Sequence, residues 1–291
     1  MQPDWRKMEH ENPGLCVRTT RLVGEGWNSR AYLVNNELVI RCPKRAEHWE
    51  ELNREIAFLA LTADKLPLPV PRYLQVAPDS SVAPHGYAIY RYLRGEAMDL
   101  DRLSKDQHDA AADTLAGFLR QLHALQLGSE SGVVLPQENG RLIAEQYRAG
   151  AESEIIPRLS RRTREALWKV FETYLSDSGN FLFKPVILHA DFSRDHVLAE
   201  DGEVTGVIDF GDVNQGDPDY DFMYLFVELG LAFAGNVARR YGRLDLPRLR
   251  SKLRYFGIVD QVDTILNGQG YATASQQSAA WQRLERLLQS A

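Results

Sequence analysis

The sequence has few cysteines and no long apolar segment. Cys16 and Cys42 are the only cysteines in 291 residues, so there is neither a disulfide framework nor a zinc-ligand spacing. No uninterrupted run reaches the roughly 18 apolar residues that a membrane-spanning helix needs. The N-terminal stretch MQPDWRKMEHENPG lacks the apolar centre of a secretory signal. We therefore expect a protein of the reducing cytoplasm and no membrane association.

An excess of positive charge is also missing. The chain has 34 Lys and Arg against 40 Asp and Glu, a formal net charge of −6. A nucleic-acid-binding protein needs a basic surface, so we expect no nucleic-acid partner. The mild acidity is compatible with a polycationic ligand, although it is equally ordinary for a cytoplasmic protein.

Short alternating segments dominate the first third of the sequence. Residues 17–41 form three such segments, separated by GEGWNS and by Asn35-Asn36, a pair that suits a tight hairpin turn. Residues 46–62 have apolar side chains at helical spacing. Two further strand-like pieces lie between 73 and 93. The pattern predicts a small sheet with one helix.

Helical periodicity takes over after about residue 95, interrupted by a short β region between 184 and 210 in which Asp201-Gly202 is predicted to form a hairpin turn. Breaks in the helical C-terminal part are expected near Gly242, Gly257 and Gly268–Gly270. The whole pattern predicts an α+β protein with two lobes, residues 1–93 and 96–291, joined by a hinge at about 90–95. We expect the ligand site in a cleft between the lobes.

A glycine-containing loop lies between the first two predicted strands. Gly24 and Gly26 would let the backbone approach a phosphate group, and Ser29 could add a hydroxyl donor. A plain hairpin loop explains the same residues, because the loop lacks the third glycine of the stronger nucleotide motifs.

Nucleotide phosphates also need a cation. Arg41 lies inside the third predicted strand, and Lys44 lies just past it. A helix carboxylate that orients the cation would complete the arrangement. Glu55, next to the apolar face of helix 46–62, is the first candidate and Glu51 the second; surface exposure is the alternative for both.

Two carboxylates and a histidine cluster in the later β region. Asp191 follows the strand that ends at His189, Asp209 ends the strand VTGVIDF, and His196 begins the strand between them. Such a hairpin would bring Asp191, His196 and Asp209 to one end of a small β unit. Rigid strands and an exposed loop are well suited to presenting catalytic groups.

Two reactions can use this cluster. In phosphoryl transfer, Asp191 accepts the proton of an attacking hydroxyl and Asp209 holds Mg²⁺ on the nucleotide phosphates. In two-metal hydrolysis, His189, Asp191, His196 and Asp209 would be the ligands. Hydrolysis would leave the glycine loop without a role, so we favour phosphoryl transfer.

The order of these segments resembles the aminoglycoside phosphotransferase family, which is related to the protein kinases. The segments are GEGWNSRAYLV, VIRCP, NREIAFL, HADFSRDHVL and VIDFGDVNQGDPDYD, and the similarity runs from about residue 17 to at least 230. The resemblance implies a protein-kinase-like fold with a β-rich N-terminal lobe and a mainly helical C-terminal lobe. It also implies ATP or GTP as phosphoryl donor, Mg²⁺ as cofactor and a hydroxyl group as acceptor.

The resemblance also implies roles for single residues. Asp191 matches the catalytic aspartate, Asp209 the Mg²⁺ ligand, and Glu55 the glutamate that pairs with the strand cation. The segment Tyr90 to Leu93, which includes Tyr92, matches the hinge that meets the nucleotide base. The family carboxylates at Asp217 and Asp221 are interpreted as bracing the catalytic loop.

Two positions depart from the family pattern. His196 stands where most relatives have the asparagine that binds a second Mg²⁺, and imidazole is a poor ligand for that ion. We therefore expect His196 to act on the metal through a water molecule, or one metal ion to carry more of the load. Macrolide phosphotransferases resemble this sequence in having histidine there, so we do not interpret the site as inactive. Arg41 stands where many relatives have lysine; it keeps the charge but offers a planar fork of donors.

The acceptor implied by the resemblance is an antibiotic, with an aminoglycoside as first choice. Its positive charges should meet carboxylates, for which the candidates are Asp195, Asp217, Glu228, Glu145 and Glu152. The apolar segment Phe222 to Gly235 is expected to be a buried helix, but as an exposed wall it would suit a macrolide.

Several alternatives stay open at this point. The acceptor could be a macrolide or another small polyhydroxylated metabolite, and a pseudokinase-like module could bind nucleotide without transfer. Tyr90 could crowd the base pocket and shift the preference from ATP to GTP. We expect a monomer.

Overall fold

The computed structural model describes residues 2–243, 245–268 and 272–289. These form two compact units. The first unit contains the chain up to Met98, together with Leu127–Val134 and Asp195–Asp212. The second contains Asp99–Gln126, Leu135–Arg194 and the chain from Val213 onward. The sequence-based division at about residue 95 places Asp195–Asp212 in the C-terminal lobe. In the structure this segment packs with the first unit.

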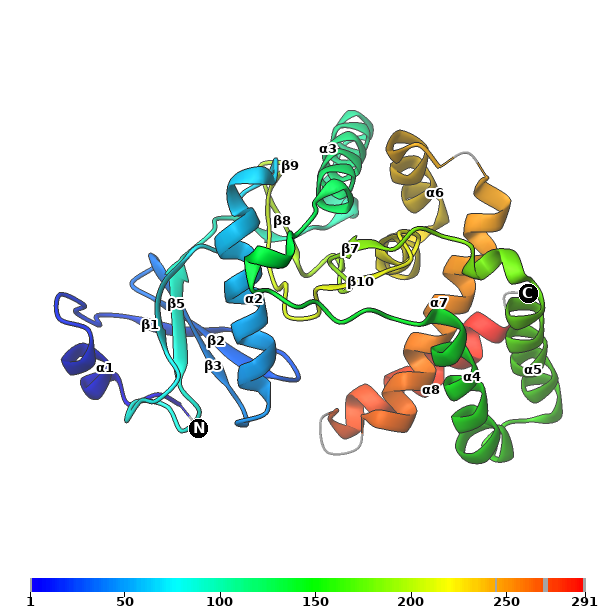
Figure 1. The fold of residues 1–291 in the computed structure, drawn as a ribbon, viewed down its shortest axis with the longest axis horizontal. Helices are drawn as coiled ribbons and strands as arrows, with labels where there is room; N and C mark the ends of the chain where they lie inside the picture. Colours follow the sequence, from blue (N-terminus) through cyan, green and yellow to red (C-terminus); the bar gives the residue numbers. More distant parts are fainter. Residues whose placement is uncertain (1, 244, 269–271, 290–291) are drawn as a thin grey trace. The chain divides into compact units, whose positions relative to one another are not determined.

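A five-stranded antiparallel sheet forms the centre of the first unit (Figure 1), with the order β1-β2-β3-β5-β4. Its strands are β1 (Thr20–Glu25), β2 (Ser29–Val34), β3 (Leu38–Pro43), β4 (Tyr73–Ala77) and β5 (Tyr87–Arg91). The turn between β2 and β3 is made by Asn35 and Asn36, both with φ of 55°. Asparagine tolerates this left-handed conformation better than most residues, as the hairpin prediction requires.

The described part of the first unit contains two α-helices, α1 (Trp5–Glu11) and α2 (His48–Thr62). Figure 1 shows α2 running alongside the sheet. The buried face of α2 contains Leu52, Phe58 and Leu59 at helical spacing, and it also contains Glu55. A buried carboxylate on an otherwise apolar face needs a charged or hydrogen-bonding partner.

A small antiparallel sheet, β6 (Glu96–Ala97), β8 (Val197–Glu200) and β9 (Glu203–Val207), attaches Asp195–Asp212 to the first unit. Asp201 and Gly202 form the predicted hairpin turn, with φ of 53° and 85°. Gly95 permits the close approach of β6 and β8. Its φ is 120°, and a Cβ there would lie 2.7 Å from Thr205 Oγ1 and 3.1 Å from the backbone of Ala199.

The second unit is mainly helical. Its helices are α3 (Lys105–Ala124), α4 (Gly140–Gly150), α5 (Arg161–Ser176), α6 (Met223–Tyr241), α7 (Leu246–Asn267) and α8 (Ala274–Gln289), and its strands are β7 (Val186–Leu188) and β10 (Asn214–Gly216).

The expected helix breaks are only partly present. The break at Gly257 is wrong: α7 is continuous there, and Gly257 is buried. The break at Gly242 is confirmed, since α6 ends there with φ of 110°. At the last expected break, Gly268 caps the end of α7, whereas Gln269 and Gly270 lie outside the described residues.

The segment Tyr220–Tyr241, which contains α6, is long and apolar enough to cross a membrane by length and composition alone. It packs against α3 and α7 within the second unit, and 44% of its most apolar window is buried there. Gly230, with φ of 86° and ψ of 162°, kinks the helix in the middle. Leu225 and Phe233 are buried, while Leu231 is 40% exposed, so the expectation of a buried helix holds for one face of α6.

Candidate active site

Arg41 on β3 is the central residue of the site in the first unit, and it is only 9% exposed. Its Nη1 donates to Glu55 Oε2 at 2.6 Å. Its Nη2 donates to Asp209 Oδ1 at 3.0 Å and to Ser29 Oγ at 3.1 Å. One guanidinium therefore links β3, α2, the first residue of β2 beside the glycine loop and the segment after β9, and the pairing of Arg41 with Glu55 is present as expected.

The charges in this group depend on one another. Burial raises the pKa of Glu55, which is fully buried, while Arg41 and a hydrogen bond from Tyr73 oppose the rise. Burial works against the charge of Arg41, but Asp209 and Glu55 outweigh it and hold the pKa of the guanidinium well above its usual value. Removing one member of such a buried pair leaves an uncompensated charge, at a cost of about 3–5 kcal/mol.

A pocket lies next to Arg41, lined by residues of the first unit only. It brings together the predicted nucleotide and metal residues Gly24, Gly26, Ser29, Arg41, Tyr90, Tyr92, His196 and Asp209. Glu55 lies behind Arg41 and does not line it. Asp195, which we expected to meet the acceptor, lines the same pocket as the glycine loop.

Glu51, the second candidate for pairing with Arg41, anchors the glycine loop instead. Its carboxylate accepts a hydrogen bond from the side-chain amide of Asn28. The carbonyl of Asn28 accepts the backbone N–H of Lys44 at 2.8 Å, so the loop is held from two sides. Lys44 itself pairs with Glu25 at 3.3 Å, which leaves Arg41 as the cation of the buried group.

Asp209 presents a carboxylate that fits a magnesium ion. It follows β9 with a left-handed φ of 65°, and its side chain is 37% exposed. Oδ1 accepts from Arg41, and Oδ2 lies 3.5 Å from His196 Nε2. Mg²⁺ is commonly held by one or two carboxylates together with substrate phosphates. Within the described ranges, no group of three or more His, Cys, Asp or Glu side chains gathers into a metal site.

The loop after β7 carries Asp191 in the second unit. Ala190 has a left-handed φ of 67°, which is uncommon for a residue with a side chain. Asp221, only 2% exposed, accepts the N–H groups of His189 at 2.9 Å and Ala190 at 2.8 Å. His123 Nε2 lies 2.9 Å from the same carboxylate. Asp221 thus holds the backbone on both sides of the His189–Ala190 peptide, and the bracing contacts predicted for Asp221 are confirmed.

His189 is fully buried and already engaged. Its Nδ1 accepts the backbone N–H of Asp191 at 3.3 Å, and its ring lies edge-on to Phe192. Two-metal hydrolysis would need this imidazole as a metal ligand. Its contacts are those of a structural residue that shapes the loop.

Asp217, predicted to brace the catalytic loop and named as a candidate for acceptor binding, lies in a buried ion pair. It pairs with Lys252 Nζ at 2.5 Å and accepts the N–H of Asp219 at 3.0 Å. Lys252 is 4% exposed and also contacts Asp219 at 2.6 Å. Burial raises the pKa of Asp217, and the charge of Lys252 opposes the rise. Asp217 is therefore part of a buried ion-pair network around Lys252.

Glu228, the third candidate for acceptor binding, accepts the backbone N–H of Arg194 at 2.9 Å. This contact joins α6 to the loop that carries Asp191. Glu145 and Glu152 form ion pairs along their own chain segment, with Arg141 at 3.8 Å and with Arg148 at 3.4 Å.

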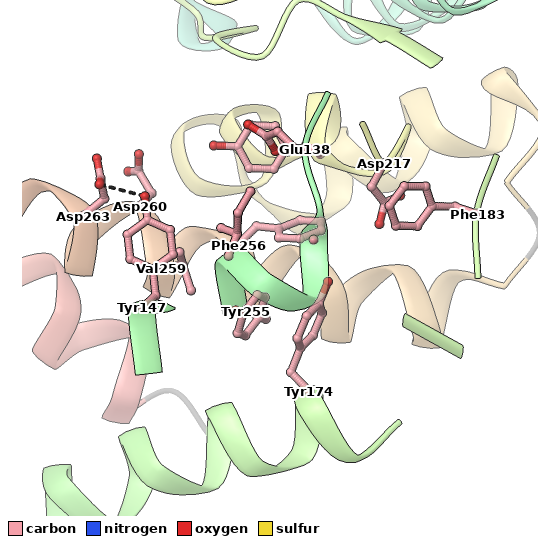
Figure 2. Close-up of a pocket in the computed structure, with 13 residues that line it drawn as sticks. Glu138, Tyr147, Tyr174, Phe183, Asp217, Tyr255, Phe256, Val259, Asp260 and Asp263 are labelled. Atoms are coloured by element: carbon pink, nitrogen blue, oxygen red, sulfur yellow. Dashed lines mark hydrogen bonds between the residues drawn. The ribbon is translucent and has the colours of Figure 1, made fainter. Parts of the chain in front are cut away.

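A second pocket lies entirely within the second unit (Figure 2). It combines aromatic rings with four carboxylates, which are those of Glu138, Asp217, Asp260 and Asp263. The rings are those of Tyr147, Tyr174, Phe183, Tyr220, Tyr255 and Phe256. Sequence reasoning missed all of these except Asp217, because they come from α4, α5, α7 and separate loops. The spacing of Asp260 and Asp263, three residues apart on one helix face, was the available signal.

Asp260 is a buried carboxyl of this pocket with a raised pKa. Burial, followed by the charge of Asp263, raises its pKa to about 6, although a hydrogen bond from Tyr224 at 2.8 Å opposes the rise. Tyr147 donates to Asp263 Oδ1 at 2.7 Å, as Figure 2 shows. A cationic ligand would reduce the mutual repulsion of these carboxylates.

A five-stranded antiparallel sheet with a buried cation–glutamate pair, together with a helical unit that presents an aspartate after a strand, defines a kinase-like phosphotransferase. The model of the Phosphotransferase enzyme family matches residues 19–256. The chain belongs to this family and is a small-molecule kinase. The predicted α+β, protein-kinase-like fold is confirmed.

Solved structures of similar proteins agree with this assignment. The GDP complex of an aminoglycoside 2'-phosphotransferase-IIIa is 27% identical, with a TM-score of 0.91, 98% of this chain and 97% of that chain being covered. The GDP and kanamycin complex of APH(2")-IIIa is 28% identical, with a TM-score of 0.89 and 97% coverage of each chain. A macrolide 2'-phosphotransferase type I, 20% identical with a TM-score of 0.73 and coverage of 96% and 95%, shares the fold.

Proposed function

We propose that this kinase transfers the γ-phosphoryl group of ATP or GTP to a hydroxyl group of an aminoglycoside. The observation that carries the proposal is the single guanidinium of Arg41, held by Glu55 beside Ser29 of the glycine loop and Asp209. A fixed cation, a glycine loop and a carboxylate in one pocket are the groups that bind a nucleoside triphosphate and its metal ion in kinases. Relatives in complex with GDP or ADP support a nucleotide donor.

The first-unit pocket is the proposed nucleotide site. The backbone at Gly24 and Gly26 approaches the phosphates, Arg41 neutralises them, and Tyr90 and Tyr92 meet the base. Mg²⁺, held by Asp209 and the phosphates, would reduce the charge that develops on the transferred group. His196, 3.5 Å from Asp209, orients that carboxylate rather than binding the ion, because Mg²⁺ prefers oxygen donors.

Asp191 is the proposed catalytic residue. Its loop is fixed by Asp221 and by the buried ring of His189, so the backbone that carries the carboxylate stays in one place while an acceptor hydroxyl approaches. The carboxylate accepts the hydroxyl proton as the oxygen attacks the γ-phosphorus, and the nucleoside diphosphate leaves. Such general-base assistance contributes roughly 10²- to 10⁴-fold.

The second-unit pocket is the proposed acceptor site. Four carboxylates and several tyrosines suit a ligand with several ammonium and hydroxyl groups, as aminoglycosides have. Asp217 contributes indirectly, because Lys252 already neutralises it. Glu228 supports the Asp191 loop, and Asp195 borders the nucleotide site. The charge favours an aminoglycoside over a macrolide.

The decisive experiment is consumption of Mg²⁺–ATP and Mg²⁺–GTP in the presence of aminoglycosides, macrolides and small metabolic alcohols, with mass spectrometry of the products. A phosphorylated aminoglycoside supports the proposal. Phosphorylation of a macrolide or a metabolite alone overturns the acceptor, and binding of nucleotide without transfer to any acceptor indicates a pseudokinase. We further propose a cytoplasmic location, since both nucleotides are cytoplasmic substrates. The monomeric state stays a prediction.

Replacing Asp260 by asparagine is expected to raise the KM for the aminoglycoside about tenfold or more at pH 7.5, since a hydrogen bond to a charged group contributes roughly 1.5–3 kcal/mol. The pKa of about 6 also predicts a pH dependence in the wild type. As the pH falls from 7 to 5, Asp260 takes up a proton and attracts a cation less, so the acceptor KM rises. Folding stability has the opposite trend. Because the pKa of Asp260 is higher in the folded protein than in the unfolded chain, the free energy of unfolding rises as the pH falls through about 6.

Steady-state kinetics between pH 5 and 8 test this prediction, with Glu165→Gln on the exposed part of α5 as the control. The groups that act on Asp260 include Asp263 and Gln261 on its own helix, Tyr224 and Glu228 on α6, and Arg283 on α8. The variant should lose most of the rise in acceptor KM at low pH. An unchanged KM and pH profile would place the acceptor elsewhere.

The wild type is expected to use GTP at least as well as ATP. Tyr90 lines the nucleotide pocket, and its ring is held edge-on against Tyr73 at 5.4 Å, so it cannot easily move away from a base. We expect Tyr90→Leu to relax the preference toward ATP. The ratio of kcat/KM for the two nucleotides measures this, and a strong preference of the wild type for ATP would contradict it.

A further inference from the structure

Tyr73 makes a contact in the first unit that neither the motifs nor the family resemblance assigns. It is the first residue of β4, and its Oη donates to Glu55 Oε1 at 2.8 Å. Arg41 donates to the other oxygen of the same carboxylate, Oε2, at 2.6 Å. The two oxygens of Glu55 therefore have different partners, one from β3 and one from β4.

The position of Tyr73 is itself fixed by the sheet. Tyr73 lies opposite Tyr90 in the register of β4 and β5, and the two rings meet edge-to-face at 5.4 Å. Edge-to-face aromatic pairs contribute about 0.5–1.5 kcal/mol beyond their buried area. The hydroxyl of Tyr73 is thus presented to Glu55 from a rigid strand and not from a mobile loop.

A carboxylate that is held by one oxygen can still rotate about its last side-chain bond, because such terminal torsions have broad energy wells. Holding the second oxygen fixes the plane of the group. The plane matters here because Arg41 is a planar fork whose Nη2 must reach Ser29 and Asp209 while Nη1 stays on Glu55. Glu55 is fully buried, so water offers little replacement for the lost donor.

We propose that Tyr73 is a positioning residue for nucleotide binding: it fixes the carboxylate plane of Glu55 and thereby the direction of the Arg41 fork. The inference rests on the proposed function, in which Arg41 meets the nucleotide phosphates. Tyr73 does not line the nucleotide pocket, so its effect passes through Glu55 and Arg41.

Replacing Tyr73 by phenylalanine tests the inference, because the ring and its contact with Tyr90 remain and only the hydroxyl is lost. The nucleotide KM should rise about five- to tenfold while the acceptor KM stays within twofold, an effect of the size of one lost hydrogen bond to a charged group. Tyr87→Phe is the matched control. Tyr87 is buried in the same sheet, and its hydroxyl accepts from Asn12 at 2.8 Å away from the pocket.

A double-mutant comparison separates positioning from general loosening of the fold. Arg41→Met removes the group that Tyr73 is proposed to orient, so adding Tyr73→Phe to it should change the nucleotide KM by less than twofold. Direct titration of each variant with GDP gives the same comparison without turnover. Coupled residues show such non-additivity, whereas independent ones do not.

The outcomes distinguish failure of the proposed function from failure of the proposed role of Tyr73. A wild type that transfers no phosphoryl group and binds no nucleotide overturns the proposed function. An active wild type in which Tyr73→Phe behaves like Tyr87→Phe overturns the role of Tyr73 alone. A rise in both the nucleotide and the acceptor KM, or full additivity with Arg41→Met, also overturns it, because a local effect through Arg41 predicts neither.

Discussion

Replacing Asp191 by asparagine is expected to lower kcat by about 10³-fold, within the roughly 10²- to 10⁴-fold range of general-base catalysis. Asparagine has nearly the same size and cannot accept the hydroxyl proton. The backbone should keep its conformation, since the N–H groups of His189 and Ala190 are held by Asp221 and not by Asp191. The substitution thus removes the base without loosening the loop.

The measurement is kcat with an aminoglycoside acceptor, together with GDP affinity by calorimetry. Affinity for GDP should change by less than threefold, because the nucleotide pocket is built from the first unit alone. Asp177→Asn, at an exposed position between α5 and the next turn, is the control for a lost carboxylate in the second unit. A variant that keeps more than a tenth of the wild-type kcat would show that another group accepts the proton.

One hairpin in each of the two sheets of the first unit was predictable, because its turn residues favour a left-handed backbone conformation. Asn35-Asn36 and Asp201-Gly202 are residue pairs that accept positive φ, and both form the expected hairpins. Strand β10 was not predictable from local pattern. Its three residues, Asn214–Gly216, are polar or small and pair with β7, more than 20 residues earlier in the chain. Only the tertiary partner makes this segment a strand.

Helix α7 shows how burial overrides local preference. Gly257 weakens a helix in isolation, which is why a break was expected there. In the structure a Cβ at this position would come within 2.7 Å of Val227 Cγ2 on α6, so the absent side chain lets the two helices approach closely. The glycine is a packing residue, and the neighbouring buried residues keep the helix continuous.

The candidate site was predictable where one motif carries the residue and unpredictable where charges from distant segments meet. Arg41, Glu55 and Asp209 could be named because each lies in a segment of recognisable pattern. The pairing of Asp217 with Lys252, 35 positions later, could not, because a lysine on an amphipathic helix is normally exposed. The contact of Tyr73 with Glu55 could not be predicted either, because nothing in the local sequence YLQVA indicates a buried acidic partner.

Replacing Asp209 by asparagine is expected to lower nucleotide-dependent turnover by roughly 10²- to 10³-fold, since a bound metal supplies several kcal/mol of charge stabilisation and each 1.4 kcal/mol is tenfold. Asparagine tolerates the left-handed φ of 65° as well as aspartate does, so the backbone after β9 should be retained. Arg41 keeps Glu55 as its partner and stays buried. The variant should therefore lose metal binding and keep its fold.

The dependence of turnover on Mg²⁺ concentration is the informative measurement. The variant should need at least tenfold more Mg²⁺ for half-maximal activity, whereas its affinity for GDP without metal should rise slightly, because one negative charge near the phosphates is gone. Asp64→Asn, an exposed member of an ion pair with Arg72 in the same unit, is the matched control. An unchanged Mg²⁺ dependence would mean that Asp209 serves only to hold Arg41, and the metal ligand would have to be sought on another residue.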